Sequence, residues 1–219
     1  MDQYPTVIER VATENGEIQL QKRDNDYEII FNGTFLMATY NGKSEKLLVR
    51  WAIEAADLPQ TVLIGGLGVG FSLGEALNHE MIEKITVIEI EKKIIEWNRT
   101  YLSVFSGEAL THRKVDVVNA DFIEWMKSSK EKYDVICLDI DNGPDWVVIA
   151  KNSKLYSDTG ICTLLKILNQ SGAISFWSAA KCAAFAEWLR KWFNRVDVRE
   201  VSDKRGEPDY IYLASSPKI

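Results

Sequence analysis

The sequence predicts an α/β fold with a doubly wound, seven-stranded, mostly parallel sheet and a small N-terminal β-hairpin appendage. From Thr61 onward, short apolar runs alternate with amphipathic segments, which is typical of parallel strands joined by right-handed crossovers. A Gly-rich turn follows the first of these runs, and the chain closes with two strand-like runs around a turn-rich link. With 219 residues, 46% of them hydrophobic, the chain is long enough to bury one substantial core.

The first 58 residues predict a small antiparallel meander followed by a helix. The dipeptide Asn32-Gly33 is a strong hairpin signal between two β-like runs. Apolar residues at helical spacing predict a helix over 44–56, which Pro59 ends. The meander strands are predicted at 17–22, 27–31 and 34–39. We therefore expect residues 1–58 to form this appendage and residues 59–219 to form a nucleoside-binding domain.

The remaining elements follow in order along the second part of the chain. Apolar runs predict parallel strands at 61–64, 85–90, 115–119, 133–140 and 173–177. The intervening segments predict helices at 71–78, 91–101, 122–129 and 158–168, and a last helix at 181–193. Two final strands, 196–201 and 210–215, flank a hairpin link at 202–209 that contains Gly and Pro.

Composition excludes several classes of partner. A formal net charge of -6 disfavours nucleic acid and anionic membranes, which bind clustered Lys and Arg. No apolar stretch approaches the ~20 residues of a membrane span, and residues 1–9 lack the apolar run of a signal peptide. The three widely spaced cysteines favour buried thiols over a disulfide framework or a metal site. We expect a cytoplasmic protein with no metal.

The Gly-rich turn is the first candidate binding element. Gly65, Gly66, Gly68 and Gly70 follow a buried strand and precede a helix, so the backbone can approach a bound nucleoside where a Cβ would collide. Glu89 ends the next strand, about 20 residues on, where a carboxylate can accept both ribose hydroxyls. Lys is absent between Thr61 and Glu83, so an uncharged or cationic nucleoside fits better than a nucleotide.

The third strand ends in another acid. Asp121, with the backbone amide of Phe122, is placed to read an adenine edge. The alternative is structural: Asp121 and Glu89 cap helices, and the glycines only permit tight packing. Because three strand ends carry these features in order, we favour a nucleoside site.

Acidic residues also follow the fourth strand. Asp139, Asp141 and Asp145 would form an acidic mouth beside the nucleoside, where carboxylates attract an ammonium substrate and one accepts a proton from an attacking amine. Turn propensity and helix capping are the competing explanation, most strongly for Asp141 and Asp145. Trp177, at the end of the fifth strand, is predicted to wall the same pocket, and Tyr40 and Glu45 to reach over it from the appendage.

Several motifs together resemble the spermidine synthase family of aminopropyltransferases, within the class I S-adenosylmethionine-dependent methyltransferase superfamily. They include Ile64-Gly65-Gly66, Val87-Ile88-Glu89-Ile90-Glu91, Asn119-Ala120-Asp121 and Leu138-Asp139-Ile140-Asp141-Asn142-Gly143-Pro144-Asp145, with Glu96-Trp97-Asn98-Arg99 typical of a bacterial spermidine-synthase-like branch. The resemblance implies a Rossmann-like fold. It also implies that Glu89 holds the ribose, Asp121 the adenine, and that Asp139 is the base. The implied donor is decarboxylated S-adenosylmethionine or S-adenosylmethionine, and the implied partner is a small amine.

The motifs also leave alternatives open. Family members usually carry Gly-Gly-Gly-Asp in the turn, whereas Gly66-Leu67-Gly68-Val69-Gly70 has no acid. The leading prediction is aminopropyl transfer to a small amine. Methyl transfer from S-adenosylmethionine is a close alternative, and a non-catalytic nucleoside-binding protein is a third. The resemblance further implies that two copies pair as a homodimer.

Overall fold

The computed structural model describes residues 4–147, 149–202 and 206–218, and it contains the predicted seven-stranded sheet. The strand order is β10-β11-β9-β8-β5-β6-β7. Strands β5, β6, β7, β8 and β9 pair in parallel, and β11 runs antiparallel to both β9 and β10. The doubly wound, mostly parallel sheet is therefore confirmed. Its strands are β5 Thr61–Gly65, β6 Lys84–Glu89, β7 Val115–Asn119, β8 Tyr133–Leu138, β9 Leu168–Ser178, β10 Phe193–Val201 and β11 Asp209–Pro217.

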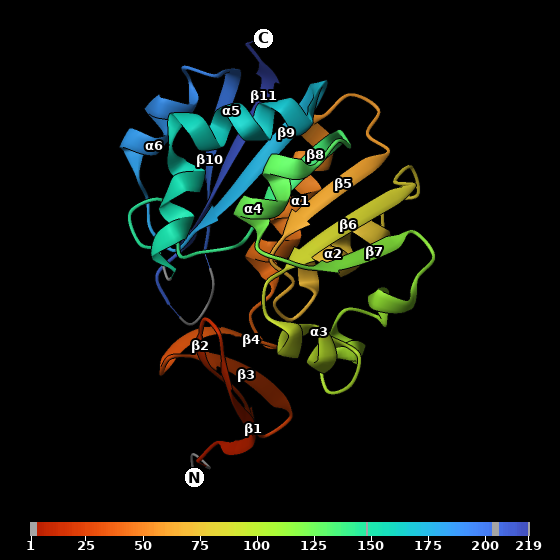
Figure 1. Ribbon diagram of the computed structural model, residues 1–219, viewed down its shortest axis with the longest axis vertical. Coiled ribbons are helices and arrows are strands. Elements are labelled where there is room, and N and C mark those ends of the chain that lie inside the picture. Colours follow the sequence, from red (N-terminus) through yellow and green to blue (C-terminus); the bar gives the residue numbers. More distant parts are fainter. Residues whose placement is uncertain (1–3, 148, 203–205, 219) are drawn as a thin grey trace.

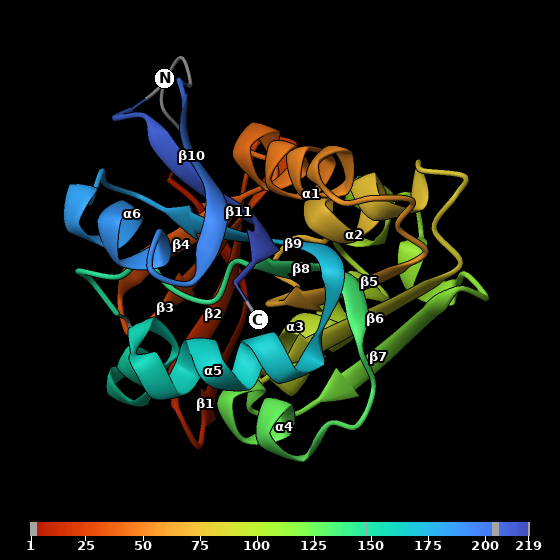
Figure 2. The same ribbon diagram turned by 90° about the horizontal axis from the view of Figure 1, so that it is seen from above.

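Helices cover both faces of this sheet (Figure 2). Val62 and Ile64 pack with α1, α2 and α3 on one face, whereas Leu63 between them packs with α4, α5 and α6 on the other. Burial on both faces explains why these strands read as continuous apolar runs. The helices are α1 Lys43–Ala55, α2 Phe71–Leu77, α3 Lys92–Asn98, α4 Phe122–Ser128, α5 Asp158–Ile167 and α6 Ala183–Leu189, with short 3-10 turns η1 Ser103–Phe105, η2 Ala109–Thr111 and η3 Ala150–Tyr156. No helix of the described residues is long and apolar enough to span a membrane.

The N-terminal appendage is a four-stranded antiparallel sheet that lies beside the larger one (Figure 1). Its strands are β1 Thr6–Thr13, β2 Gly16–Arg23, β3 Asp26–Phe31 and β4 Thr34–Ala38. The Asn32-Gly33 turn is confirmed, because both residues have positive φ, 49° and 78°. Strand β1 is absent from the sequence prediction: it has no fully buried residue, and its few apolar residues are interrupted by Glu9 and Arg10.

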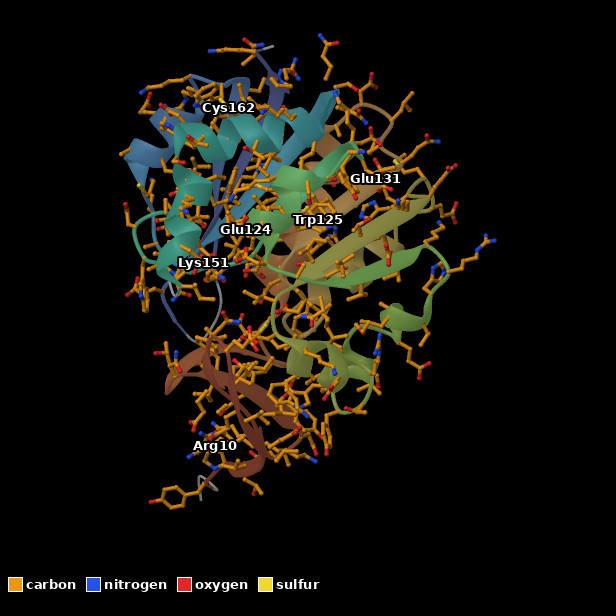
Figure 3. The ribbon with its side chains drawn as sticks, viewed as in Figure 1. Arg10, Glu124, Trp125, Glu131, Lys151 and Cys162 are labelled. Atoms are coloured by element: carbon orange, nitrogen blue, oxygen red, sulfur yellow. The ribbon has the colours of Figure 1, made fainter. Side chains whose placement is uncertain are left out.

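The structure also differs from the sequence prediction in β9, in α6 and at one cysteine. Strand β9 begins at Leu168, because the polar stretch 169–172 continues the strand instead of forming a loop. Helix α6 is shorter than the predicted 181–193. The thiol of Cys162 is exposed on α5 (Figure 3), so the expectation of burial is wrong for this cysteine. The predicted link 202–209 and the N-terminal segment 1–9 lie partly outside the described residues, at 203–205 and 1–3. The division at residue 58 stays a prediction.

Hydrogen bonds fasten the small sheet to α3. From β1, Glu9 accepts hydrogen bonds from Lys93 Nζ at 2.7 Å and from Trp97 Nε1 at 2.8 Å, and these contacts lower the pKa of Glu9. At the β1–β2 turn, Thr13 and Asn15 donate to Glu91 at 3.2 and 2.8 Å. These contacts hold the small sheet over the end of the parallel strands.

Candidate active site

A cavity lies where the small sheet meets the carboxyl ends of the parallel strands. Its empty volume is about 1080 Å³, solvent at its mouth included. The small sheet contributes apolar side chains to one wall: Ile29, Phe31, Leu36 and Met37. The turns after β5, β6, β7 and β8 contribute glycines and acids to the other walls. The order of β8, β5 and β6 makes this edge the topological switch point, where open α/β sheets bind ligands.

The glycine turn after β5 packs tightly against the rest of the site. A Cβ on Gly66, whose φ is +89°, would lie 2.2 Å from the backbone oxygen of Asp139. A Cβ on Gly68 would lie 2.3 Å from Met37 Sδ of the small sheet. Asn98 of α3, 1% exposed, donates from Nδ2 to the Gly68 oxygen at 2.7 Å. The turn is thus fixed in place by contacts with Asp139, Met37 and Asn98.

Glu89 stands at the end of β6, next to this turn. Its two carboxylate oxygens accept backbone hydrogen bonds from Leu67 and Glu91, each at 2.8 Å. The residue is 5% exposed. Burial raises its pKa, although the backbone donors act in the opposite direction. The N–H groups fix the carboxyl against the turn, and a carboxylate oxygen has further lone pairs with which to accept a ligand hydroxyl.

Asp121 both caps α4 and lines the cavity. Its Oδ1 accepts hydrogen bonds from the backbone N–H groups of Ile123 and Glu124 at 2.8 and 3.4 Å. Its Oδ2 forms an ion pair with Lys151 Nζ at 2.5 Å, and Lys151 extends from η3 (Figure 3). Burial acts to raise the pKa of Asp121, but Lys151 and the backbone donors outweigh it and lower the pKa. The capping explanation is therefore correct, and it does not remove Asp121 from the cavity wall.

Asp139 follows β8 and lies among other acids. Its backbone N–H donates to the Gly65 oxygen at 2.9 Å, which ties it to the glycine turn. Burial raises the pKa of its carboxyl well above the ordinary value, and the charges of Glu45, Asp209 and Glu89 add to the effect. A raised pKa makes its carboxylate a stronger base.

Ser44 links two of these acids at the start of α1. Its hydroxyl lies 2.9 Å from Glu45 Oε2 and 2.6 Å from Asp209 Oδ2, and it accepts a hydrogen bond from Trp177 Nε1 at 3.1 Å. Because one hydroxyl carries one hydrogen, it cannot donate fully to both carboxylates. Burial is the main cause that raises the pKa of Glu45 to about 7.

The cavity brings together most of the residues that the sequence predicts. Nine of them line it: Glu45, Gly66, Gly68, Glu89, Asp121, Phe122, Asp139, Asp141 and Trp177. Gly65 and Gly70 flank the turn without lining the cavity, and Asp145 and Tyr40 are also outside the lining residues. The functional roles of these residues stay predictions.

Sequence reasoning missed three side chains that shape the site. Met37 reaches Gly68 from the small sheet, Asn98 holds the turn from α3, and Asp209 joins Ser44 from β11. Only Asn98 carried a signal, as part of the Glu96-Trp97-Asn98 motif. Trp97 binds the small sheet while Asn98 binds the glycine turn, so this motif connects the two walls of the cavity.

The strand order and the position of the cavity define a protein with the class I methyltransferase-like α/β fold. Within that class, the chain belongs to the spermine/spermidine synthase family, because the family model for the spermine/spermidine synthase domain matches residues 43–191.

Individual relatives agree with the family. A polyamine aminopropyltransferase from Saccharolobus solfataricus is 29% identical over 72% of this chain and 50% of its own length. One from Thermococcus onnurineus is 33% identical over 51% of this chain and 39% of its own. This chain spans about half the length, or less, of these curated relatives.

Solved structures agree with the fold. A spermidine synthase in complex with the transition-state analogue AdoDATO superposes with a TM-score of 0.82 at 21% identity, covering 96% of this chain and 74% of that chain. The spermidine synthase from Thermotoga maritima gives a TM-score of 0.79 at 19% identity, over 96% and 72%. At such identities the likeness shows the fold.

Proposed function

We propose that the protein transfers an aminopropyl group from decarboxylated S-adenosylmethionine to a small amine. The observation that carries this proposal is one cavity in which the glycine turn and Glu89 stand beside the acid Asp139. Membership of the spermine/spermidine synthase family supports the same reaction.

The nucleoside would occupy the end of the cavity at β5, β6 and β7. Gly66 and Gly68 line this end of the cavity, and without side chains their backbone packs directly against Asp139 and Met37. Glu89 accepts the ribose hydroxyls. Asp121 and the backbone amide of Phe122 read the adenine edge, with Lys151 keeping Asp121 ionised.

The amine would enter beside Asp139, with Asp141 and Trp177 as further walls. Its nitrogen lone pair attacks the propyl carbon bonded to the sulfonium. The new N–C bond forms as the C–S bond breaks, the electron pair goes to sulfur, and methylthioadenosine leaves. Asp139 accepts the proton that the nitrogen loses. Because the sulfonium is already a good leaving group, alignment and removal of one proton supply most of the catalysis.

Methyl transfer from S-adenosylmethionine is the second candidate, since residues 65–70 carry no ionisable side chain that would repel the carboxylate of that donor. Mass spectrometry separates the two reactions. We expect decarboxylated S-adenosylmethionine with 1,3-diaminopropane, putrescine or spermidine to yield an aminopropylated amine and methylthioadenosine. A methylated amine formed from S-adenosylmethionine instead would overturn the proposal.

Binding of methylthioadenosine without turnover of either donor would favour a non-catalytic nucleoside-binding protein. Pairing of two copies as a homodimer and a cytoplasmic location stay predictions. Size-exclusion chromatography with light scattering tests the pairing.

A further inference from the structure

Met37 covers part of the glycine turn from the small sheet. It lies on β4, and its side chain lines the cavity together with Gly68. A Cβ on Gly68 would lie 2.3 Å from Met37 Sδ and 2.9 Å from Met37 Cε. The end of the Met37 side chain therefore fills the space beside Gly68 into which a larger residue of the turn would extend.

The peptide group between Gly68 and Val69 is held at both ends. Its oxygen accepts a hydrogen bond from Asn98 Nδ2 at 2.7 Å, and its N–H, which belongs to Val69, donates to Met37 Sδ at 3.2 Å. A thioether sulfur is a weak acceptor. Among the described residues, no oxygen accepts from this N–H. The Val69 N–H is thus directed at a side chain of the cavity wall and is only weakly satisfied there.

An N–H in this position would bind a ligand carboxylate if it were uncovered. The hydrogen bond from a backbone N–H to a carboxylate is roughly twice as strong as one between neutral groups. Met37 stands in the way of such a bond. Its side chain packs against the hydrophobic core, and its strand pairs with β3 at Ile29, so a ligand that displaces it must break those contacts. A ligand without a carboxylate has no need to displace it.

We propose that Met37 is a specificity-determining residue: by covering the Val69 N–H it denies the glycine turn to a donor carboxylate, and it selects decarboxylated S-adenosylmethionine over S-adenosylmethionine. This inference rests on the proposed function, because it names the residue that chooses between the donors of the two candidate reactions. The turn itself carries no ionisable side chain at 65–70, so this choice is made by a residue of the small sheet.

Calorimetric titration with two donors that differ only in the carboxylate tests the assignment, with methylthioadenosine as the reference without either tail. Met37→Ala uncovers the N–H. It is expected to narrow the preference for the decarboxylated donor by about tenfold, through stronger binding of S-adenosylmethionine, and to leave the affinity for methylthioadenosine unchanged. Met37→Val also falls short of the turn but favours a β-strand, so it should give the same result if alanine impairs folding.

Met37→Leu separates covering of the N–H from the chemistry of sulfur. Leucine keeps the volume of the side chain and offers no acceptor, so this variant is expected to keep most of the preference. Met81→Ala is the matched control, because it removes the same side chain from an exposed position before β6. It is expected to change none of the three affinities.

Three results would overturn the assignment. The first is an unchanged donor preference in Met37→Ala and Met37→Val. The second is an equal loss of affinity for all three nucleosides in these variants, which would mean that Met37 only supports the fold of the pocket. The third is an equal narrowing of the preference in Met37→Leu and Met37→Ala, because covering of the N–H would then have no effect.

The outcomes also separate this inference from the proposed function. A wild-type protein that prefers the decarboxylated donor in binding, loses that preference in Met37→Ala and forms no product contradicts aminopropyl transfer while supporting the role of Met37. A protein that forms the aminopropylated amine but keeps its donor preference in Met37→Ala contradicts the role of Met37 alone. A wild-type protein that binds both donors equally also contradicts that role, whether or not product forms.

Discussion

Replacement of Gly66 by alanine tests the close approach of two strand ends on which the site depends. Gly66 has φ +89°, a conformation that costs an L-residue about 1–2 kcal/mol. The new Cβ would also lie 2.2 Å from the backbone oxygen of Asp139. That contact is with the main chain, so the strand ends must move apart, at a cost of about 1–3 kcal/mol. The sum predicts a loss of roughly 2–5 kcal/mol in the free energy of unfolding.

Gly33→Ala is the matched control for this substitution. Gly33 also has positive φ, +78°, but a Cβ there meets no atom within 4 Å. It should therefore lose only the backbone contribution, about 1–2 kcal/mol. Urea unfolding measures both losses, and titration with methylthioadenosine should show weaker binding in Gly66→Ala alone. Equal losses of stability in the two variants would refute the close approach between the glycine turn and Asp139.

Three further predictions concern catalysis, the glycine turn and pH. Asp139→Asn is expected to lower kcat by about 10²–10⁴-fold because it removes the proposed base, with methylthioadenosine affinity retained; unchanged turnover would rule out this role. Asn98→Ala removes the hydrogen bond to the Gly68 oxygen, so we expect weaker methylthioadenosine binding in calorimetry and a loss of about 1–3 kcal/mol in stability; full affinity would contradict a positioning role. The third concerns Glu45, whose pKa rises from 4.5 to about 7 on folding. Between those pH values Glu45 holds a proton in the folded protein that it has released in the unfolded chain. Its contribution to the free energy of unfolding is therefore fully present below pH 4.5 and is lost as the pH rises through 7. Urea unfolding across this range should show a smaller fall in the free energy of unfolding for Glu45→Gln than for the wild type. An equal fall in both would refute the raised pKa of Glu45.

The central strands of the large sheet were predictable because they are buried on both faces. Runs such as Val62-Leu63-Ile64 supply apolar residues to two cores at once, so they stand out in the sequence. Strand β1 has the opposite character. It is held by pairing with β2 and by contacts such as Glu9 with Trp97, 88 residues away, which no local pattern encodes.

The acids of the site were predictable for a topological reason. Glu89, Asp121 and Asp139 follow parallel strands, and the carboxyl ends of such strands meet at one edge of the sheet. Met37 and Asp209 instead reach the site from β4 and β11, outside the βα units, so their positions depend on how distant segments pack. The sequence therefore predicted the acids at the strand ends, but it did not predict the side chains that other segments contribute to the site.

The buried acids have a consequence for the proposed reaction. Burial and neighbouring acids raise the pKa values of Asp139 and Glu45, which favours their protonated forms while the cavity holds no cation. An entering sulfonium or ammonium supplies the opposite charge, lowers both pKa values and favours the carboxylates. In the proposed reaction, binding of the donor thus prepares the base, so Asp139 is most readily ionised when there is a substrate to deprotonate.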